Sequence, residues 1–137
     1  MAAGGRHTCA LTNANVAWCW GAADRGQLGD GQSGEPSSRR VNPQMPFALS
    51  GIGRSLGDGQ CGWNADGVVA CWGDNRRGQS DPFSGEDIVL PSIIALPAPA
   101  VMVASGEDHS CALLEGGFVR CWGSDDDGQI GDFALYE

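Results

Sequence analysis

The fold is decided by residues 106–132, GEDHSCALLEGGFVRCWGSDDDGQIGD, because two varied copies of this stretch lie upstream. In each copy a cysteine stands ten residues before a Cys-Trp-Gly triplet, and a Gly-Gln pair follows the triplet at a constant distance. The triplets begin at Cys19, Cys71 and Cys121, so successive copies are 52 and 50 residues apart. A period of this length is typical of propellers and solenoids rather than of a single layered core.

The ten-residue cysteine spacing fits a β-hairpin with a three-residue loop. If the two cysteines of a copy face each other in antiparallel register, the loops are residues 13–15, 65–67 and 115–117. Each loop ends in Asn or Gly, which most easily adopt the left-handed conformation that such loops need. If the pair closing the loop is hydrogen-bonded, alternation makes the cysteine pair non-hydrogen-bonded, with its Cα atoms within the reach of a disulfide.

We therefore predict one disulfide in each hairpin: Cys9 with Cys19, Cys61 with Cys71, and Cys111 with Cys121. The alternative is six unpaired thiols that pack as small apolar side chains, since the oxidising compartment is itself inferred. Paired cysteines indicate a secreted, periplasmic or cell-surface protein. Residues 1–6 have neither the basic nor the apolar region of a secretion signal, so we expect a removed signal or an excised piece.

Composition favours many tight turns and disfavours nucleic acid as a partner. The chain has 137 residues, 22 glycines and a formal net charge of -9, which repels phosphate backbones. The most apolar segment is 88–104, but Pro91, Pro97 and Pro99 exclude a membrane-spanning helix there. We expect strands at about 92–96 and 100–104 instead.

The predicted fold is all-β: three blades of a partial β-propeller, each with about four antiparallel strands. Residues 1–137 are expected to form a single repeat array, with units at about 1–35, 36–85 and 86–137. We expect the first blade to be incomplete at its N-terminal side. Between the first two hairpins, only short strands near 40–42 and 47–52 are expected in a loop-like stretch.

Three short motifs resemble the repeats of the regulator of chromosome condensation family, in particular its cysteine-bearing versions in bacterial secreted proteins. They are H-x-C-A-L (residues 7–11), V-x-C-W-G (119–123) and G-Q-L-G-D (26–30). The resemblance implies a seven-bladed propeller in the complete family member. Such propellers act as exchange factors for a small GTPase, as chromatin-binding platforms and, in bacteria, as inhibitors that grip an enzyme.

The resemblance also implies structural roles for the recurring positions of the repeat. The three tryptophans are expected to fill the space between blades, and the glycines after them to permit a tight turn. The Gly-Gln pairs are assigned a structural role as well. The full set is Trp20, Trp72, Trp122, Gly26, Gln27, Gly78, Gln79, Gly128 and Gln129.

No cofactor, metal site or catalytic group is expected. His7 and His109 each lie two residues before a cysteine, yet the second repeat has no histidine and no C-x-x-C spacing occurs. Residues 125–128 lack the alternating acidic residues and the distal Glu of an EF-hand calcium loop. We therefore interpret this stretch as a solvated loop and not as a calcium site. Asp108, His109 and Ser110 are neighbours on one strand and cannot converge as a triad.

The loops after each Cys-Trp-Gly, residues 22–25, 74–77 and 124–127, differ sharply in charge while their flanks stay the same. A constant frame with variable exposed tips suits recognition of a protein or polysaccharide. The predicted binding residues are Asp24, Arg25, Asn75, Arg76, Arg77, Asp125, Asp126 and Asp127. The alternatives are an architectural or self-assembling surface component, and an exchange factor for a small GTPase. An exchange factor acts in the nucleus or cytosol, where the reducing environment keeps cysteines from forming disulfides. The paired cysteines therefore disfavour this function.

Three blades of this size cannot bend into a closed ring. We therefore expect either a part of a longer propeller chain or self-association through exposed apolar blade faces.

Overall fold

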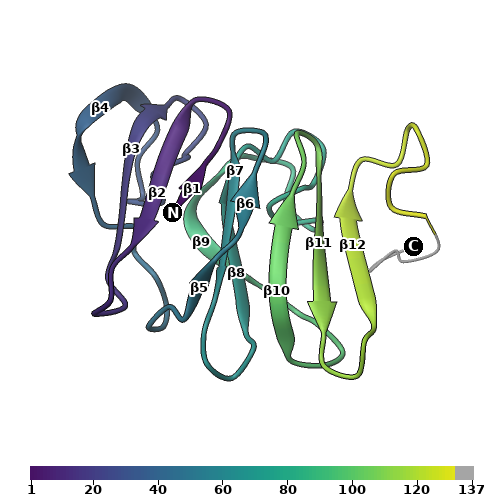
Figure 1. The fold of residues 1–137 in the computed structure, drawn as a ribbon. Helices are drawn as coiled ribbons and strands as arrows, with labels where there is room; N and C mark the ends of the chain where they lie inside the picture. Colours follow the sequence, from purple (N-terminus) through teal and green to yellow (C-terminus); the bar gives the residue numbers. More distant parts are fainter. Residues whose placement is uncertain (132–137) are drawn as a thin grey trace.

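The computed structural model describes residues 1–131, and the regular structure in this part of the chain is all β. Three four-stranded sheets lie side by side, with β4 at one side of the molecule and β12 at the other (Figure 1). The strands are β1 (Ala2–Ala3), β2 (His7–Leu11), β3 (Ala17–Ala23), β4 (Gly34–Val41), β5 (Gly51–Ile52), β6 (Arg54–Ser55), β7 (Gly59–Trp63), β8 (Val69–Gly73), β9 (Ile88–Ile94), β10 (Ala100–Ser105), β11 (His109–Leu114) and β12 (Val119–Gly123). The predicted all-β fold is confirmed. Within residues 1–131 there is no helix long and apolar enough to span a bilayer.

Each sheet forms one blade, with sequential strands as neighbours. The first blade has the order β1-β2-β3-β4 and the second β5-β7-β8-β9. We call β4 and β9 the outer strands, because each is the last strand of its blade and pairs only with the strand before it. The third blade contributes β10, β11 and β12, and its fourth strand is β6, which crosses from the second blade and pairs in parallel with β10.

The three central hairpins have the register that the cysteine spacing predicts. Cys9 lies opposite Cys19, Cys61 opposite Cys71, and Cys111 opposite Cys121. The Cα atoms of these pairs are 4.1, 4.1 and 4.0 Å apart, and all three pairs form disulfides. The last loop residues have φ of 61° at Asn15, 77° at Gly67 and 86° at Gly117, as the predicted three-residue loops require.

Three expectations for the strands were wrong. β4 spans eight residues instead of three, because a strand that pairs on one side only does not need the apolar alternation used to find strands. β9 begins at Ile88, before Pro91, because a proline is tolerated in a strand with one unpaired edge. The stretch 47–52 provides only the two-residue β5.

The expectation of an incomplete first blade is also wrong. Ala2 lies opposite Cys9 as Ala104 lies opposite Cys111, so two residues suffice to supply the strand that begins this blade. Among the described residues it is the third blade that has only three strands of its own. The sheets are also offset from the sequence units proposed at 1–35, 36–85 and 86–137, since the first blade ends at Val41 and the second at Ile94.

Apolar side chains fill the two seams between blades, and two of the three disulfides are part of this core. The seam between the first and second blades contains Cys9, Cys19, Ala23, Leu28 and Trp72. The seam between the second and third blades contains Cys61, Val69, Cys71, Ile94, Ala100, Val103, Ala112, Leu114 and Trp122. The Cys9–Cys19 and Cys61–Cys71 bridges therefore both close their hairpins and fill space between blades.

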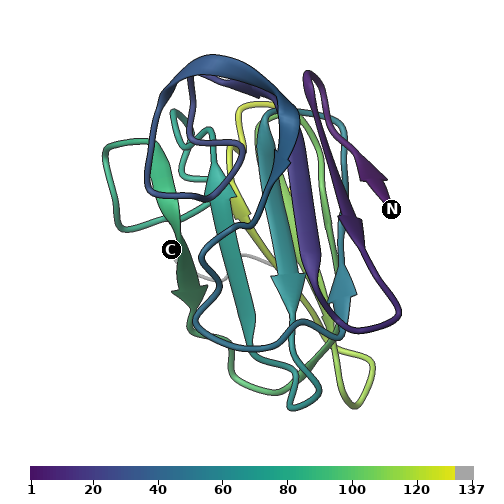
Figure 2. The same ribbon diagram turned by 90° about the vertical axis from the view of Figure 1, so that its left-hand side faces the viewer.

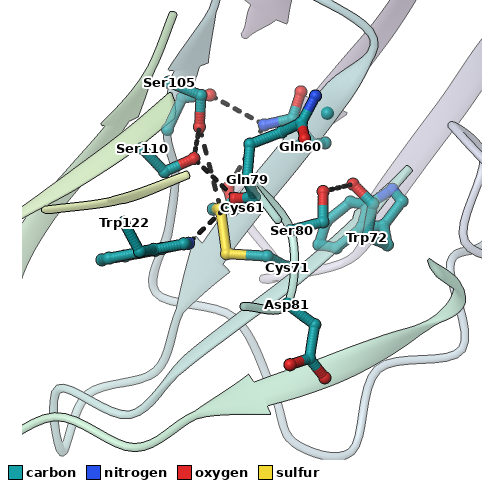
Figure 3. Close-up of a disulfide and its surroundings, with 12 residues drawn as sticks. Gln60, Cys61, Cys71, Trp72, Gln79, Ser80, Asp81, Ser105, Ser110 and Trp122 are labelled. Atoms are coloured by element: carbon teal, nitrogen blue, oxygen red, sulfur yellow. Dashed lines mark hydrogen bonds between the residues drawn. A yellow bond between two sulfur atoms is a disulfide. The ribbon is translucent and has the colours of Figure 1, made fainter. Parts of the chain in front are cut away.

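A tryptophan crosses each seam and donates a hydrogen bond to the preceding blade. Trp72 Nε1–H donates to the main-chain oxygen of Gln27, and Trp122 Nε1–H to that of Gln79, both at 2.8 Å. Ser110 Oγ donates to the same Gln79 oxygen at 2.9 Å, beside the Cys61–Cys71 disulfide (Figure 3). Both tryptophans are almost fully buried, whereas Trp20 is half-buried and has no such bond within residues 1–131.

Replacing Cys61 and Cys71 together by alanine is expected to lower the free energy of unfolding by roughly 3 kcal/mol, because the unfolded chain gains conformational freedom. Denaturant titration of wild type and variant measures this difference. Reduction of the oxidised wild type should also raise its intact mass by six hydrogens, since all six cysteines are paired. A smaller mass increase would show that at least one bridge is absent.

Trp72→Phe is expected to destabilise the protein by about 2 kcal/mol, because it leaves the buried Gln27 carbonyl without the indole donor. Trp20→Phe is the matched control, and a smaller loss is expected there because no indole bond is removed. Thermal and denaturant unfolding of both variants provide the comparison. Equal losses at the two positions would show that ring volume, not the hydrogen bond, determines the effect.

Candidate functional site

Each blade presents two loops at the same end of its hairpin: an entry loop before the first cysteine strand and an exit loop after Cys-Trp-Gly. The first exit-loop residue donates its main-chain N–H to the entry loop in all three blades, at 2.9, 3.1 and 2.8 Å. These bonds are Ala22 to Arg6, Asp74 to Asp58, and Ser124 to Asp108. We call residues 4–6, 22–25, 56–58, 74–77, 106–108 and 124–127 the loop face.

The entry loops of neighbouring blades touch through their backbones. Gly5 N–H donates to the Gly57 oxygen at 2.7 Å. A Cβ on Gly57 would lie 2.8 Å from the Cα of Glu107, so only glycine fits between the second and third blades. The loop face is therefore continuous across the three blades.

The glutamine of each Gly-Gln pair holds the tip of its exit loop in place. Its side-chain Oε1 accepts the main-chain N–H of the residue two positions earlier, at 2.8, 2.9 and 2.9 Å. The pairs are Gln27 with Arg25, Gln79 with Arg77, and Gln129 with Asp127. The intervening glycines have φ of 75°, 78° and 74°, a conformation that side chains other than glycine disfavour. One frame thus holds three tips of different charge.

In the first blade the tip charges are paired. Arg6 Nη2 lies 3.1 Å from Asp24 and 2.7 Å from Asp58 of the second blade. Arg25 pairs with Asp87 at 3.2 Å. The hydrogen bond from Gln27, together with the Arg6 guanidinium, lowers the pKa of Asp24. The predicted binding residues of this tip, Asp24 and Arg25, therefore already form ion pairs within the same chain.

The arginines of the second tip are paired as well. Arg76 makes two side-chain hydrogen bonds to the nearly buried Asp74, at 2.9 and 2.7 Å. Arg77 pairs with Asp126 of the third blade. All four arginines of the loop face therefore have carboxylate partners within residues 1–131.

Asn75 is a correction to the predicted binding set, because it is only 2% exposed. Its Nδ2 donates to the main-chain oxygens of Asp81, Ser84 and Glu86, and its Oδ1 accepts the N–H of Ser80 and Asp81. It organises the chain that follows and cannot be reached by a partner. Asp125, at the same loop position, accepts the N–H of Ile130 at 3.1 Å.

Acidic side chains that form no ion pair within residues 1–131 gather on the third blade. Glu107 and Asp127 are exposed and Asp108 is half-buried. No side-chain hydrogen bond or ion pair joins any of the three to another residue in the described range 1–131. Two hollows lie beside them, of about 290 and 590 Å³, the first lined by Arg6, Asp58, Asp74, Arg76, Glu107 and Asp108. This end of the loop face therefore has an excess of negative charge.

The entry-loop charges are functional candidates that the sequence interpretation missed. Arg6, Asp58 and Asp108 each lie three residues before the first cysteine of their hairpin. All three are charged, and the structure brings the first two into contact across a seam. Aligning the repeats on the cysteines would have revealed this position.

His7 lies beneath the entry loop and is nearly fully buried. Its Nε2 lies 3.1 Å from Gln60 Oε1, and because Gln60 donates its own amide to the Gly53 oxygen, Nε2 carries the proton. The other nitrogen, Nδ1, is buried against Gly4, and no group in residues 1–131 forms a hydrogen bond with it. Burial lowers the pKa of His7, although Gln60 and Asp58 oppose this shift.

Stability is therefore expected to fall as the pH drops below the ordinary histidine pKa of 6.5. The folded protein has the lower pKa, so the unfolded chain binds more protons between that value and 6.5. The contribution of neutral His7 is complete above pH 6.5 and is lost as the pH falls towards the folded pKa. Melting temperatures at about pH 7.5 and about pH 5.5 test this expectation.

The protein has two histidines, which provides an internal control for that measurement. The decrease in melting temperature should persist in His109→Gln and shrink in His7→Gln. Persistence of the full decrease in His7→Gln would assign it to other groups.

Comparison with known proteins identifies the repeat. Residues 1–27 and 101–129 match the family described as Regulator of chromosome condensation (RCC1) repeat. The protein named "Probable E3 ubiquitin-protein ligase HERC4" from Homo sapiens is 30% identical over 137 residues, covering 96% of this chain and 13% of that protein. "Regulator of chromosome condensation" from Mus musculus is 32% identical over 135 residues, covering 94% and 31%. The chain thus spans less than a third of these relatives.

Solved structures share the fold. Human WBSCR16 superposes with a TM-score of 0.80 at 20% identity, over 88% of this chain and 31% of that one. Yeast RCC1 (Prp20), in its complex with Kap60, superposes with a TM-score of 0.73 at 20% identity, over 90% and 31%. At this identity the likeness shows the fold alone, and it confirms the three sheets as blades of a β-propeller.

Proposed function

We propose that this chain, which is built of regulator of chromosome condensation repeats, is a non-catalytic module that binds a basic protein partner through its loop face. The observation that carries the proposal is the glutamine-held frame, repeated three times with tips of different charge. A rigid frame lowers the entropy lost on binding, because the contact residues are already held in position.

The charge of the partner follows from which side chains remain available. Arginines of the loop face are paired with carboxylates of the same chain, whereas Glu107, Asp108 and Asp127 form no ion pair among the described residues. Unpaired carboxylates attract lysine and arginine side chains and accelerate their association. The third-blade end of the face is therefore the preferred contact area.

A relative supports a protein as the partner. Yeast RCC1 (Prp20) has been crystallised bound to Kap60, so a protein that shares this fold binds another protein. The present chain covers 31% of that chain, and the transfer of protein binding to it is part of our proposal. We also propose a secreted, periplasmic or cell-surface location, because disulfides persist where the environment is oxidising.

The double variant Glu107→Gln with Asp127→Asn tests the loop face. We expect it to bind a synthetic lysine- and arginine-rich peptide about fivefold more weakly than wild type, with most of the loss in the association rate. Its melting temperature should be unchanged, because neither side chain has a partner in the described part of the chain. Asp125 is left intact, since its carboxylate accepts the Ile130 N–H.

A matched control removes the same charge elsewhere. Glu35 on β4 and Glu115 in the third hairpin loop are exposed and lie outside the loop face. Glu35→Gln with Glu115→Gln should leave peptide binding near the wild-type value in calorimetric titrations. If both double variants lose affinity equally, the attraction reflects net charge alone and the proposed site is wrong.

A further inference from the structure

The outer strand of the second blade differs from its counterpart in the first. β4 has the sequence GEPSSRRV, which is polar, whereas β9 has the sequence IVLPSII. Leu90 is 49% exposed and Ile93 is 56% exposed. Large apolar side chains on a soluble protein surface mark contact sites when they gather next to hollows. β9 is therefore a candidate docking strand.

The edge of β9 lies on the rim of the blade array. It is the green strand at the left-hand margin of Figure 2, on the side away from β1 and β2. Neighbouring blades pack against the two faces of the second blade, through the two apolar seams. A blade added at either end of the array would cover a face and would leave this rim open.

The backbone of β9 points hydrogen-bonding groups outward at Ile93. Cys61 and Cys71 have a Cα separation of 4.1 Å, which is typical of a non-hydrogen-bonded pair, so Cys71 directs its N–H and C=O towards β9. Ser92 lies opposite Cys71 and points back, and alternation turns the N–H and C=O of Ile93 to the outside.

The N-terminal half of the edge is already in use. A register irregularity separates Ser92 from Ile88, and in this half the Val89 oxygen accepts the N–H of Gly31 from the first blade at 2.9 Å. Pro91 has no N–H to donate. The open part of the edge is therefore its C-terminal half.

Two hollows flank this open half. The larger, of about 430 Å³, is lined by Val68, Leu96 and Pro97 among others, and the smaller, of about 130 Å³, by Pro82 and Phe83. Residues 93–95 line both. An extended peptide along the edge would place alternate side chains towards opposite faces of the sheet. Apolar side chains of such a peptide would thus reach both hollows.

An unpaired acidic group stands beside the open half of the edge. Asp66 is exposed at the rim of the larger hollow, and its carboxylate has no ion-pair partner within residues 1–131. A basic residue at the end of an apolar peptide nearest Asp66 would complement this charge, whereas an acidic residue there would be repelled.

We propose that the C-terminal half of β9 binds a short extended segment of a protein partner, apolar at its centre and basic at the end nearest Asp66, by adding a strand at Ile93. This surface lies outside the loop face and shares no residue with it. This binding site is independent of the proposed function, so failure of either proposal leaves the other unaffected.

A fluorescent, end-capped peptide Arg-Val-Ile-Val-Arg is the probe, with Glu-Val-Ile-Val-Glu as its charge-reversed control. Polarisation titration of the oxidised full chain should give saturable binding of the basic peptide below about 1 mM, and at least tenfold weaker binding of the acidic one. Ile93→Asp should weaken the basic peptide about tenfold, and Ile93→Val should retain it. Phe118→Asp, at a side chain 61% exposed in the third hairpin, should have no effect.

Amide exchange provides a second readout. Bound peptide should slow exchange of the Ile93 N–H, because that group becomes a donor in the added strand. Absence of saturable binding at 1 mM, equal binding of the two peptides, or unchanged affinity in Ile93→Asp would each overturn the proposal. So would concentration-dependent dimerisation that Ile93→Asp abolishes without any peptide binding, because the edge would then serve a second copy.

Discussion

The indole-to-carbonyl hydrogen bond across each seam is the interaction on which the rest of the structure depends. Gln27 and Gln79 each take part in two contacts, since the side chain holds the exit-loop tip and the main-chain oxygen receives the tryptophan of the next blade. Loop shape and blade spacing are therefore set by the same residue. Buried carbonyls of this kind are costly when unpaired, so a seam cannot open by a small step without losing the bond and the surrounding apolar contacts.

Hairpins were predictable from the sequence because their constraints are local. A ten-residue cysteine spacing fixes register and loop length together, and the structure follows both. The outer strands were less predictable. β4 lies at an edge where polar side chains remain in solvent, so the sequence shows neither alternation nor an apolar run. β9 contains Pro91, which normally argues against a strand, and its tolerance depends on an unpaired edge that only the assembled blade defines.

For the candidate site, the sequence located the exit loops but not the direction of each side chain. Asn75 lies in a loop predicted to be exposed, yet its amide turns inward to backbone groups up to eleven residues further along the chain. Arg6 was missed because its partner Asp58 is 52 residues away and belongs to another blade. Contacts across a seam depend on how blades stack, and no pattern within one repeat encodes that. Only the carboxylates that form no ion pair within the chain are available to a partner.

Each disulfide joins the two cysteines of one hairpin, and no cysteine is bonded to a cysteine of another blade. Oxidative maturation is consequently modular: a bridge can form as soon as its own hairpin has emerged, before the remainder of the polypeptide exists. Native pairing does not depend on the order in which blades are synthesised. Duplication or deletion of a whole repeat leaves every remaining cysteine with its original disulfide partner. An array of this design can therefore change in length during evolution while its disulfide connectivity stays the same.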